Sequence, residues 1–130
     1  MADISKGAAG EVIAARFLRE QGYELLAVNA HTRFGEVDII AADERVIAFI
    51  EVKTRGENGW EQSPREAVTR EKQEKIKKAA ASYLQRNKTD LQPRFDVIEV
   101  ITAPTGSPLS AKRVEHLKNA FETGDLHAAF

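Results

Sequence analysis

This sequence of 130 residues contains no cysteine, only one tryptophan and one methionine, and four prolines. The absence of cysteine excludes disulfide bonds, thiolate metal sites and cysteine nucleophiles. No apolar run approaches the ~20 residues that a membrane-spanning helix needs, and the N-terminus shows no hydrophobic segment of the kind found in signal peptides. We therefore expect a cytoplasmic protein with no membrane partner.

The composition is that of an ordinary globular domain, with 42% hydrophobic and 30% charged residues. We expect a single domain over residues 1–121 and a poorly ordered tail over residues 122–130. The net charge of −1 conceals an uneven distribution, because residues 65–88 carry eight basic and three acidic side chains. A positive stripe can be the footprint of a phosphate backbone, and a solvated helix face carries the same pattern.

The order of predicted elements indicates an α/β fold with a mixed sheet flanked by helices. Apolar periodicity and turn residues predict helices over residues 5–21 and 63–86, a polar loop over residues 30–35, and strands over residues 23–29, 35–40, 48–55, 95–101 and 114–121. The second helix is expected to begin with a capping box in which Ser63 is the cap, Pro64 the first helical residue and Glu66 its partner. The last predicted strand also suits a short helix, which leaves the C-terminal element open.

Two strands of a predicted hairpin carry charges that a buried sheet does not favour. If the turn is centred between Glu44 and Arg45, Asp38 lies opposite Glu51, with Cβ atoms about 4.5–5.5 Å apart. Lys53 follows Glu51 by two residues and shares its face. A turn of odd length would instead shift the register by one residue and turn Asp38 to the other face.

Facing carboxylates destabilise a sheet, and buried charges are costly unless something pairs with them. The arrangement therefore calls for a cation, and Asp38 and Glu51 are suited to hold a divalent metal ion that activates a water. The plainer alternative is that Glu51 and Lys53 form a partly solvated ion pair.

These charges belong to a longer string of residues with a recognisable pattern. The residues are Gly10, Glu11, Ala14, Gly22, Tyr23, Asn29, Gly35-Glu36-Val37-Asp38, Phe49-Ile50-Glu51-Val52-Lys53-Thr54-Arg55, Lys72 and Arg94-Phe95-Asp96-Val97. The pattern resembles the PD-(D/E)xK nuclease superfamily, which has the restriction-endonuclease-like fold, although Val37 stands where that motif has proline. Within the superfamily it is similar to archaeal-type Holliday junction resolvases and, more closely, to the YraN-like family of small, mostly uncharacterised bacterial proteins.

The resemblance implies a nuclease-like domain that hydrolyses phosphodiester bonds of DNA, with branched or structured DNA as the candidate substrate. It implies catalytic roles for Asp38, Glu51 and Lys53, and it adds Glu11 and the main-chain carbonyl of Val52 as metal ligands beside the two carboxylates. The expected cofactor is Mg²⁺, with Mn²⁺ as a substitute, because Mg²⁺ is usually held by one or two carboxylates, waters and substrate phosphate. Resolvases act as symmetric dimers, so a homodimer is possible.

Lys72 and Arg55 are the expected nucleic-acid contacts. A carboxylate site repels nucleic acid, so cations are needed nearby to bring in the phosphates. Lys72 lies in the basic helix and belongs to the resemblance, and Arg55 continues the face of Lys53. In the plainer alternative, Arg55 is an exposed strand-end arginine and Glu11 is a surface acid. Glu36 shares the face of Asp38 in strand spacing, and we expect it to be an edge charge rather than an outer acid of the site.

Two other functions are compatible with the sequence. The chain could be a nucleic-acid-binding module that keeps the nuclease fold without catalysis, or an interaction protein in which the charged cluster is structural. Outside the site, we expect a local salt bridge between Arg94 and Asp96. His31, His116 and His127 show no metal-ligand spacing, so we expect structural or surface roles for them.

Overall fold

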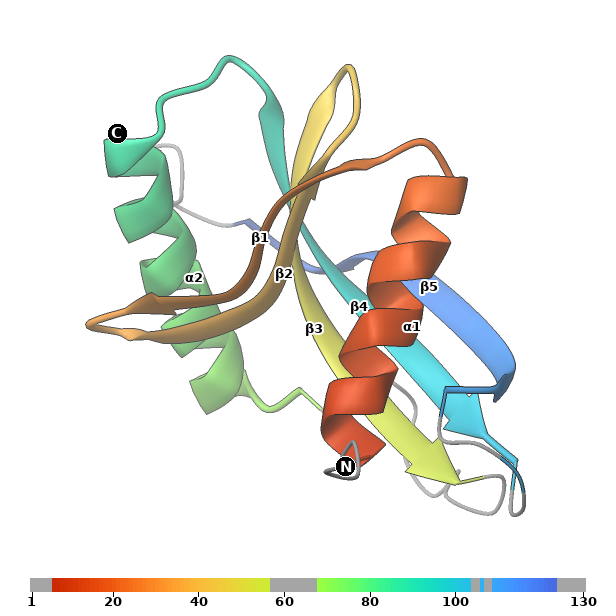
Figure 1. The fold of residues 1–130 in the computed structure, drawn as a ribbon. Helices are drawn as coiled ribbons and strands as arrows, with labels where there is room; N and C mark the ends of the chain where they lie inside the picture. Colours follow the sequence, from red (N-terminus) through yellow and green to blue (C-terminus); the bar gives the residue numbers. More distant parts are fainter. Residues whose placement is uncertain (1–5, 57–67, 104–105, 107–108, 124–130) are drawn as a thin grey trace.

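The computed structural model describes residues 6–56, 68–103, 106 and 109–123. Within these residues the elements, in chain order, are α1 (Lys6–Glu20), β1 (Glu24–Thr32), β2 (Gly35–Ala42), β3 (Val46–Gly56), α2 (Arg70–Arg86), β4 (Gln92–Thr102) and β5 (Ala111–Phe121) (Figure 1). Residues 124–130 of the predicted tail lie outside the described part. Neither of the two helices described is long and apolar enough to cross a membrane.

The strands form one mixed sheet in the order β1-β2-β3-β4-β5. All neighbours pair antiparallel except β3 and β4, which are parallel and are connected through α2. The helices α1 and α2 cover different faces of the sheet (Figure 1). The predicted α/β fold with a mixed sheet flanked by helices is therefore confirmed, and the C-terminal element is a strand.

Alternate residues of β3 pack against different helices. Ile47 and Phe49 belong to a core cluster that includes residues of α2, whereas Ala48 and Ile50 belong to a cluster that includes residues of α1. The helical members of the clusters are Ile76, Ala79, Ala80 and Leu84 of α2, and Ile13, Ala14, Ala15 and Leu18 of α1. Since β3 is buried on both faces, the next residue, Glu51, enters a buried environment and needs a partner.

β1 is longer than predicted, and the loop after it is correspondingly shorter. The sequence predicted a loop over residues 30–35 because that stretch is polar. In the structure, residues 30–32 pair antiparallel with residues 35–37 of β2. Cross-strand pairing overrides local polarity here, so only Arg33 and Phe34 connect the two strands. β1 and β2 thus form a long two-stranded arm, which curves away from β3 past α2 (Figure 1).

α2 begins later than predicted. The predicted capping box at residues 63–66 lies outside the described residues, but Val68 and Thr69 are described and are not helical. Thr69 has an extended backbone, and its side chain accepts a hydrogen bond from the backbone N–H of Lys72 at 3.2 Å, as an N-cap does. Val68 is buried in the core. The predicted end at Arg86 is confirmed.

Candidate active site

The turn between β2 and β3 sets the register of the strands that carry the site. The backbone N–H of Asp43 donates to the carbonyl of Val46 at 3.0 Å. The Asp43 carboxylate in turn accepts hydrogen bonds from the backbone N–H groups of Arg45 and Val46, at 2.8 and 2.7 Å. The turn is therefore centred between Glu44 and Arg45, and the predicted register is confirmed by the pairs that follow it.

The hairpin opens at Asp38. The β2–β3 ladder ends with the pair Ile39 and Ile50, so the next position in the same register sets Asp38 opposite Glu51. There the Asp38 Oδ2 atom accepts a hydrogen bond from the backbone N–H of Val52 at 2.8 Å. A side chain thus takes the place of a ladder bond at the point where the arm leaves β3.

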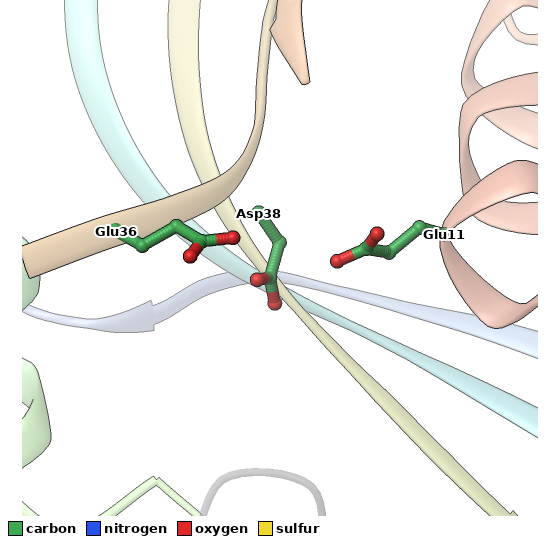
Figure 2. A group of neighbouring side chains, drawn as sticks. All are labelled: Glu11, Glu36 and Asp38. Carbon is green, nitrogen blue, oxygen red and sulfur yellow. The ribbon is translucent and has the colours of Figure 1, made fainter. Parts of the chain in front are cut away.

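Three carboxylates converge beside this opening. One oxygen from each of Glu11, Glu36 and Asp38 lies within 4.8 Å of the others. Figure 2 shows Glu11 of α1 and Glu36 of β2 reaching toward Asp38 from opposite sides. Oxygen atoms on opposite sides of one Mg²⁺ ion are about 4.2 Å apart, so small side-chain movements would bring all three onto one ion. The donor set therefore fits a hard divalent cation.

The electrostatics of Asp38 also favour a cation. Burial raises the pKa of Asp38 to about 7, and the negative charges of Glu51 and Glu11 act in the same direction. The hydrogen bond from Val52 and the charge of Lys72 lower the pKa, but they do not offset the first set of effects. Without a bound cation, the surroundings of Asp38 therefore favour its protonated form.

Glu51 is held by two lysines. Its side chain is only 6% exposed, and its Oε1 atom lies 2.5 Å from the Nζ of Lys72 and 3.6 Å from the Nζ of Lys53. Burial lowers the pKa of Lys53, and so does the neighbouring Lys72. Burial also acts to lower the pKa of Lys72, but its hydrogen bond to Glu51 and the charge of that carboxylate raise it overall. Lys72 is therefore the cation that balances Glu51.

Of these groups, all but Glu36 line one pocket with a volume of about 590 Å³. Its lining consists of Gly7, Ala8, Glu11, Asp38, Glu51, Val52, Lys53, Thr54 and Lys72. The structure thus brings together all but one of the residues that the sequence predicted for the site. The exception is Arg55, which does not line the pocket and forms an ion pair with the buried Glu99 of β4.

Two features of the site were not predicted. Glu36 joins the converging carboxylates, although the sequence favoured an edge charge, whereas Glu51 is not in that group of three. Asn29 of β1 donates a hydrogen bond from Nδ2 to the Oε2 of Glu11 at 3.2 Å. Its backbone has a left-handed φ of 52°, which asparagine tolerates better than most residues. The signal in the sequence was that Asn29 belongs to the residues that carry the family resemblance.

A close approach of α1 to β3 places Glu11 at the pocket. A Cβ atom added to Gly10 would lie 1.9 Å from the Oγ1 of Thr54 and 3.2 Å from its Cβ. Only glycine allows this spacing. The helix therefore rests directly on the strand that carries Glu51, and the neighbouring Glu11 points toward Asp38 (Figure 2).

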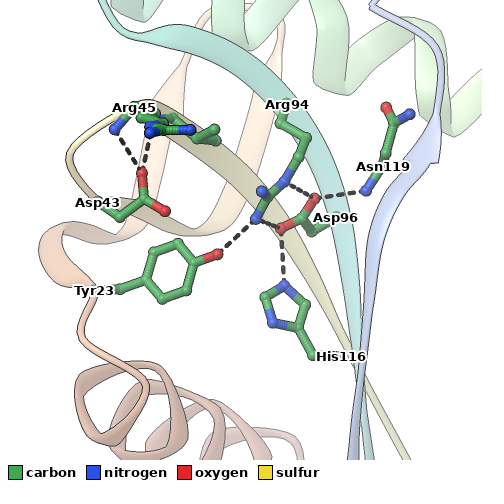
Figure 3. Close-up of polar contacts among 8 residues, drawn as sticks. Tyr23, Asp43, Arg45, Arg94, Asp96, His116 and Asn119 are labelled. Carbon is green, nitrogen blue, oxygen red and sulfur yellow. Dashed lines mark hydrogen bonds and ion pairs between the residues drawn. The ribbon is translucent and has the colours of Figure 1, made fainter.

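A second buried polar cluster lies outside the pocket and is centred on Asp96 of β4 (Figure 3). Asp96 is fully buried and accepts hydrogen bonds from Arg94 and from the backbone N–H of Asn119, and its Oδ2 lies 2.8 Å from the Nε2 of His116. Arg94 also donates to the hydroxyl of Tyr23 at 2.7 Å. The predicted salt bridge between Arg94 and Asp96 and the structural role of His116 are confirmed.

Comparison with known proteins identifies one family. The model of the family described as "Uncharacterised protein family UPF0102" matches residues 10–100. A UPF0102 protein of Acetivibrio thermocellus is 44% identical over 117 residues, which cover 88% of this chain and 89% of that protein. A UPF0102 protein of Porphyromonas gingivalis is 43% identical over 116 residues (89% and 83%), and one of Chlorobaculum tepidum is 45% identical over 121 residues (92% and 93%).

Proposed function

The chain belongs to the uncharacterised protein family UPF0102, the YraN-like family that its sequence resembles, and we propose that it is a metal-dependent endonuclease that hydrolyses phosphodiester bonds of DNA in the cytoplasm. The observation that carries the proposal is the juxtaposition, in one pocket, of acidic side chains with two lysines. The carboxylates suit a hard cation, and the lysines suit the phosphate on which such a cation would act.

Glu11, Glu36 and Asp38 are the residues that would hold Mg²⁺, or Mn²⁺ in its place. When bound, such an ion polarises a phosphate and lowers the pKa of a bound water. Glu51 contributes differently in this proposal. Its buried carboxylate lies against the ammonium groups of both Lys72 and Lys53, and so it orients them toward the pocket.

Lys53 is the candidate for handling a proton or a developing charge. Its Nζ lies 3.6 Å from Glu51, and its side chain is 29% exposed, so the substrate and water can reach it. Because burial lowers the pKa of Lys53, the ammonium releases its proton more readily than an ordinary lysine. It can accept a proton from the attacking water, or stabilise negative charge on the phosphate while protonated.

A second function is favoured by the state of Glu51. This carboxylate is satisfied by Lys72 and Lys53 and lies outside the converging group of three. A site in which an acid is neutralised in this way can bind nucleic acid without cutting it. In this alternative the two lysines bind phosphate, and the carboxylates keep the lysines in position.

Cleavage assays separate the two functions. Supercoiled, single-stranded and four-way-junction DNA, and RNA for comparison, would be incubated with Mg²⁺, with Mn²⁺ or with EDTA. We expect metal-dependent cleavage of DNA that falls at least ~100-fold in Asp38→Asn and in Glu51→Gln, the scale of losing one stabilising group in the transition state. Glu44→Gln, which removes an exposed acid in the β2–β3 turn, is the matched control and should cleave normally.

Two results would rule out nuclease activity. The first is that no substrate is cleaved, and the second is that the Asp38 and Glu51 variants cleave DNA as fast as the wild type. The binding module would then be supported by salt-sensitive binding in EDTA that survives in Asp38→Asn and falls in Lys72→Ala. Sedimentation of the protein with and without DNA tests the homodimer that cutting two strands would require.

A further inference from the structure

The tip of the β1–β2 arm, which we define as residues 32–35, presents an exposed aromatic ring. Phe34 is 37% exposed, and the guanidinium carbon of Arg33 lies 4.8 Å from the centre of its ring. More than a third of the Phe34 surface is therefore open to a ligand. Combined with a stacked arginine, it forms a flat, positively charged platform of the kind that binds nucleobases in single strands.

The turn holds this platform in place. The hydroxyl of Thr32 donates to the carbonyl of Gly35 at 2.9 Å and accepts from the backbone N–H of Phe34 at 3.1 Å. Gly35 has a φ of 143°, which lies in the region that favours glycine. Because the turn is fixed before any ligand arrives, a base that stacks on Phe34 would order little additional chain.

The arm tip lies close to the pocket and to α2. Asp38 follows Phe34 by four residues along β2, which corresponds to about 13 Å at about 3.3 Å per residue. A Cβ atom added to Gly35 would lie 3.9 Å from the Cβ of Lys75 in α2. Lys72 of the pocket is three residues before Lys75, so the two lysines share one side of the helix. The two lysine side chains therefore place positive charge between the pocket and the arm tip.

We propose that the arm tip binds an unpaired nucleobase of the substrate, which stacks on Phe34 while Lys72 and Lys75 contact neighbouring phosphates. The inference rests on the proposed action on DNA and narrows the substrate to single-stranded or branched DNA. In an intact duplex the base faces are already stacked on one another, so Phe34 cannot reach them. The Lys75–Glu71 pair does not prevent phosphate contact, because both side chains are largely exposed and such pairs are weak.

The test measures binding in EDTA, so that it does not depend on cleavage. Fluorescence anisotropy would compare a short single-stranded oligonucleotide with the duplex of the same sequence. Stacking of one base contributes about 5- to 150-fold in affinity. We expect Phe34→Ala to weaken single-strand binding within this range and to change duplex binding less than twofold. Phe34→Trp should restore the single-strand affinity.

Control variants separate stacking from charge and from folding. Val28→Ala removes another exposed apolar side chain of the same arm, 46% exposed, and should leave both affinities unchanged. Lys75→Gln should weaken both DNA forms and reduce the slope of log K against log salt by about 0.7 on the single strand. Thermal unfolding should show that Phe34→Ala remains folded at the assay temperature, although loss of the covered part of the ring lowers its stability.

The inference is overturned if Phe34→Ala leaves single-strand binding unchanged, if it weakens duplex binding equally, or if the protein binds no single-stranded DNA. Loss of the proposed function has a different signature. If the protein binds single strands through Phe34 but never cleaves with Mg²⁺, the inference about the arm tip is supported and the proposed nuclease activity is ruled out. If Phe34→Ala binds and cleaves DNA like the wild type, the nuclease activity is supported and the inference about the arm tip is ruled out.

Discussion

Asp38 combines three properties that define its part in the site. It accepts the Val52 N–H, lies beside the Glu11 and Glu36 carboxylates, and has a pKa raised to about 7 by burial and by Glu51. With these neighbours, the ionised form of the carboxyl group destabilises the folded protein unless a cation is bound. The folded protein therefore favours a proton on Asp38 at low pH and a bound cation beside it at high pH.

This preference predicts how stability depends on pH. The folded-state pKa of Asp38 lies above the value of 3.8 for an unperturbed group, so the folded protein binds the proton more tightly than the unfolded chain. The stability that this provides is complete below about pH 4 and is lost as the pH rises through 7. We expect Asp38→Asn, which still accepts from Val52, to raise the free energy of unfolding at pH 8 by about 1–2 kcal/mol after allowance for solvent screening.

Urea denaturation in EDTA at pH 5 and pH 8 measures this difference. The variant should gain more at pH 8 than at pH 5, and Glu44→Gln should show no such dependence. If Asp38→Asn is less stable than the wild type at pH 8, the ionised carboxylate of Asp38 stabilises the folded protein even without a cation, and the prediction is wrong.

Asn29 provides a second test at the scale of a residue. Asn29→Gly keeps the left-handed backbone and removes the hydrogen bond to Glu11. Groups that orient a metal ligand typically contribute 10- to 100-fold in affinity, so we expect Mn²⁺ binding about tenfold weaker by calorimetry, with little change in unfolding. Asn29→Ala should in addition lose about 1–2 kcal/mol of stability, because alanine is strained at positive φ. Unchanged Mn²⁺ affinity in both variants would show that Asn29 does not position Glu11.

At the scale of elements, the contact between α1 and β3 decides whether Glu11 reaches the site. Gly10→Ala would place a methyl group against Thr54, at separations of 1.9 and 3.2 Å from two of its atoms. We expect a loss of about 1–3 kcal/mol from overpacking, together with weaker Mn²⁺ binding as α1 moves outward. Thermal denaturation and calorimetry measure the two effects.

Gly7 is the matched control in the same helix, because a Cβ added there meets nothing within 4 Å. Gly7→Ala should be neutral or stabilising by up to about 1 kcal/mol. Adding Thr54→Ala to Gly10→Ala should recover part of the lost stability, since the closest clash is with the Thr54 hydroxyl. Equal behaviour of the two glycine variants would contradict the close approach.

At the scale of the whole molecule, the Asp96 cluster joins parts of the chain that are distant in sequence. It connects β4 with Tyr23 after α1 and with His116 and Asn119 of β5 (Figure 3). Burial raises the pKa of Asp96, but hydrogen bonds from His116, Arg94 and Asn119 together lower it below its usual value. The cluster therefore stabilises the fold as an ionised group with several donors.

A lowered pKa gives Asp96 the opposite pH dependence to Asp38. Its contribution is present above about pH 4 and is lost as the pH falls below that value. We expect Asp96→Ala to cost about 3–5 kcal/mol at pH 7, because it leaves Arg94 without its buried partner, and to cost less near pH 3. Urea denaturation at both pH values measures this. Asp90→Ala, at an exposed acid before β4, should cost less than about 0.5 kcal/mol, and a similar cost for both variants would refute the role of the cluster.

The sequence determined those features that depend on local pattern. Two runs rich in valine, isoleucine and phenylalanine, with a short polar turn between them, were enough to predict the register that sets Asp38 opposite Glu51. The start of α2 was missed because Ser63 and Thr69 are both suitable caps by local pattern, and the structure places the cap at Thr69. The end of β1 was missed because residues 30–32 are polar and become a strand only by pairing with β2.

The tertiary structure decided that an acid from α1 joins the acids of β2. Glu11 lies in α1 and reaches Asp38 because Gly10 lets the helix touch β3, a contact that no local pattern encodes. Glu36 lies two residues before Asp38 in β2, so strand spacing already sets these two acids on one face. Spacing along a strand specifies which face a side chain takes, but the meeting of groups from different elements depends on how those elements pack.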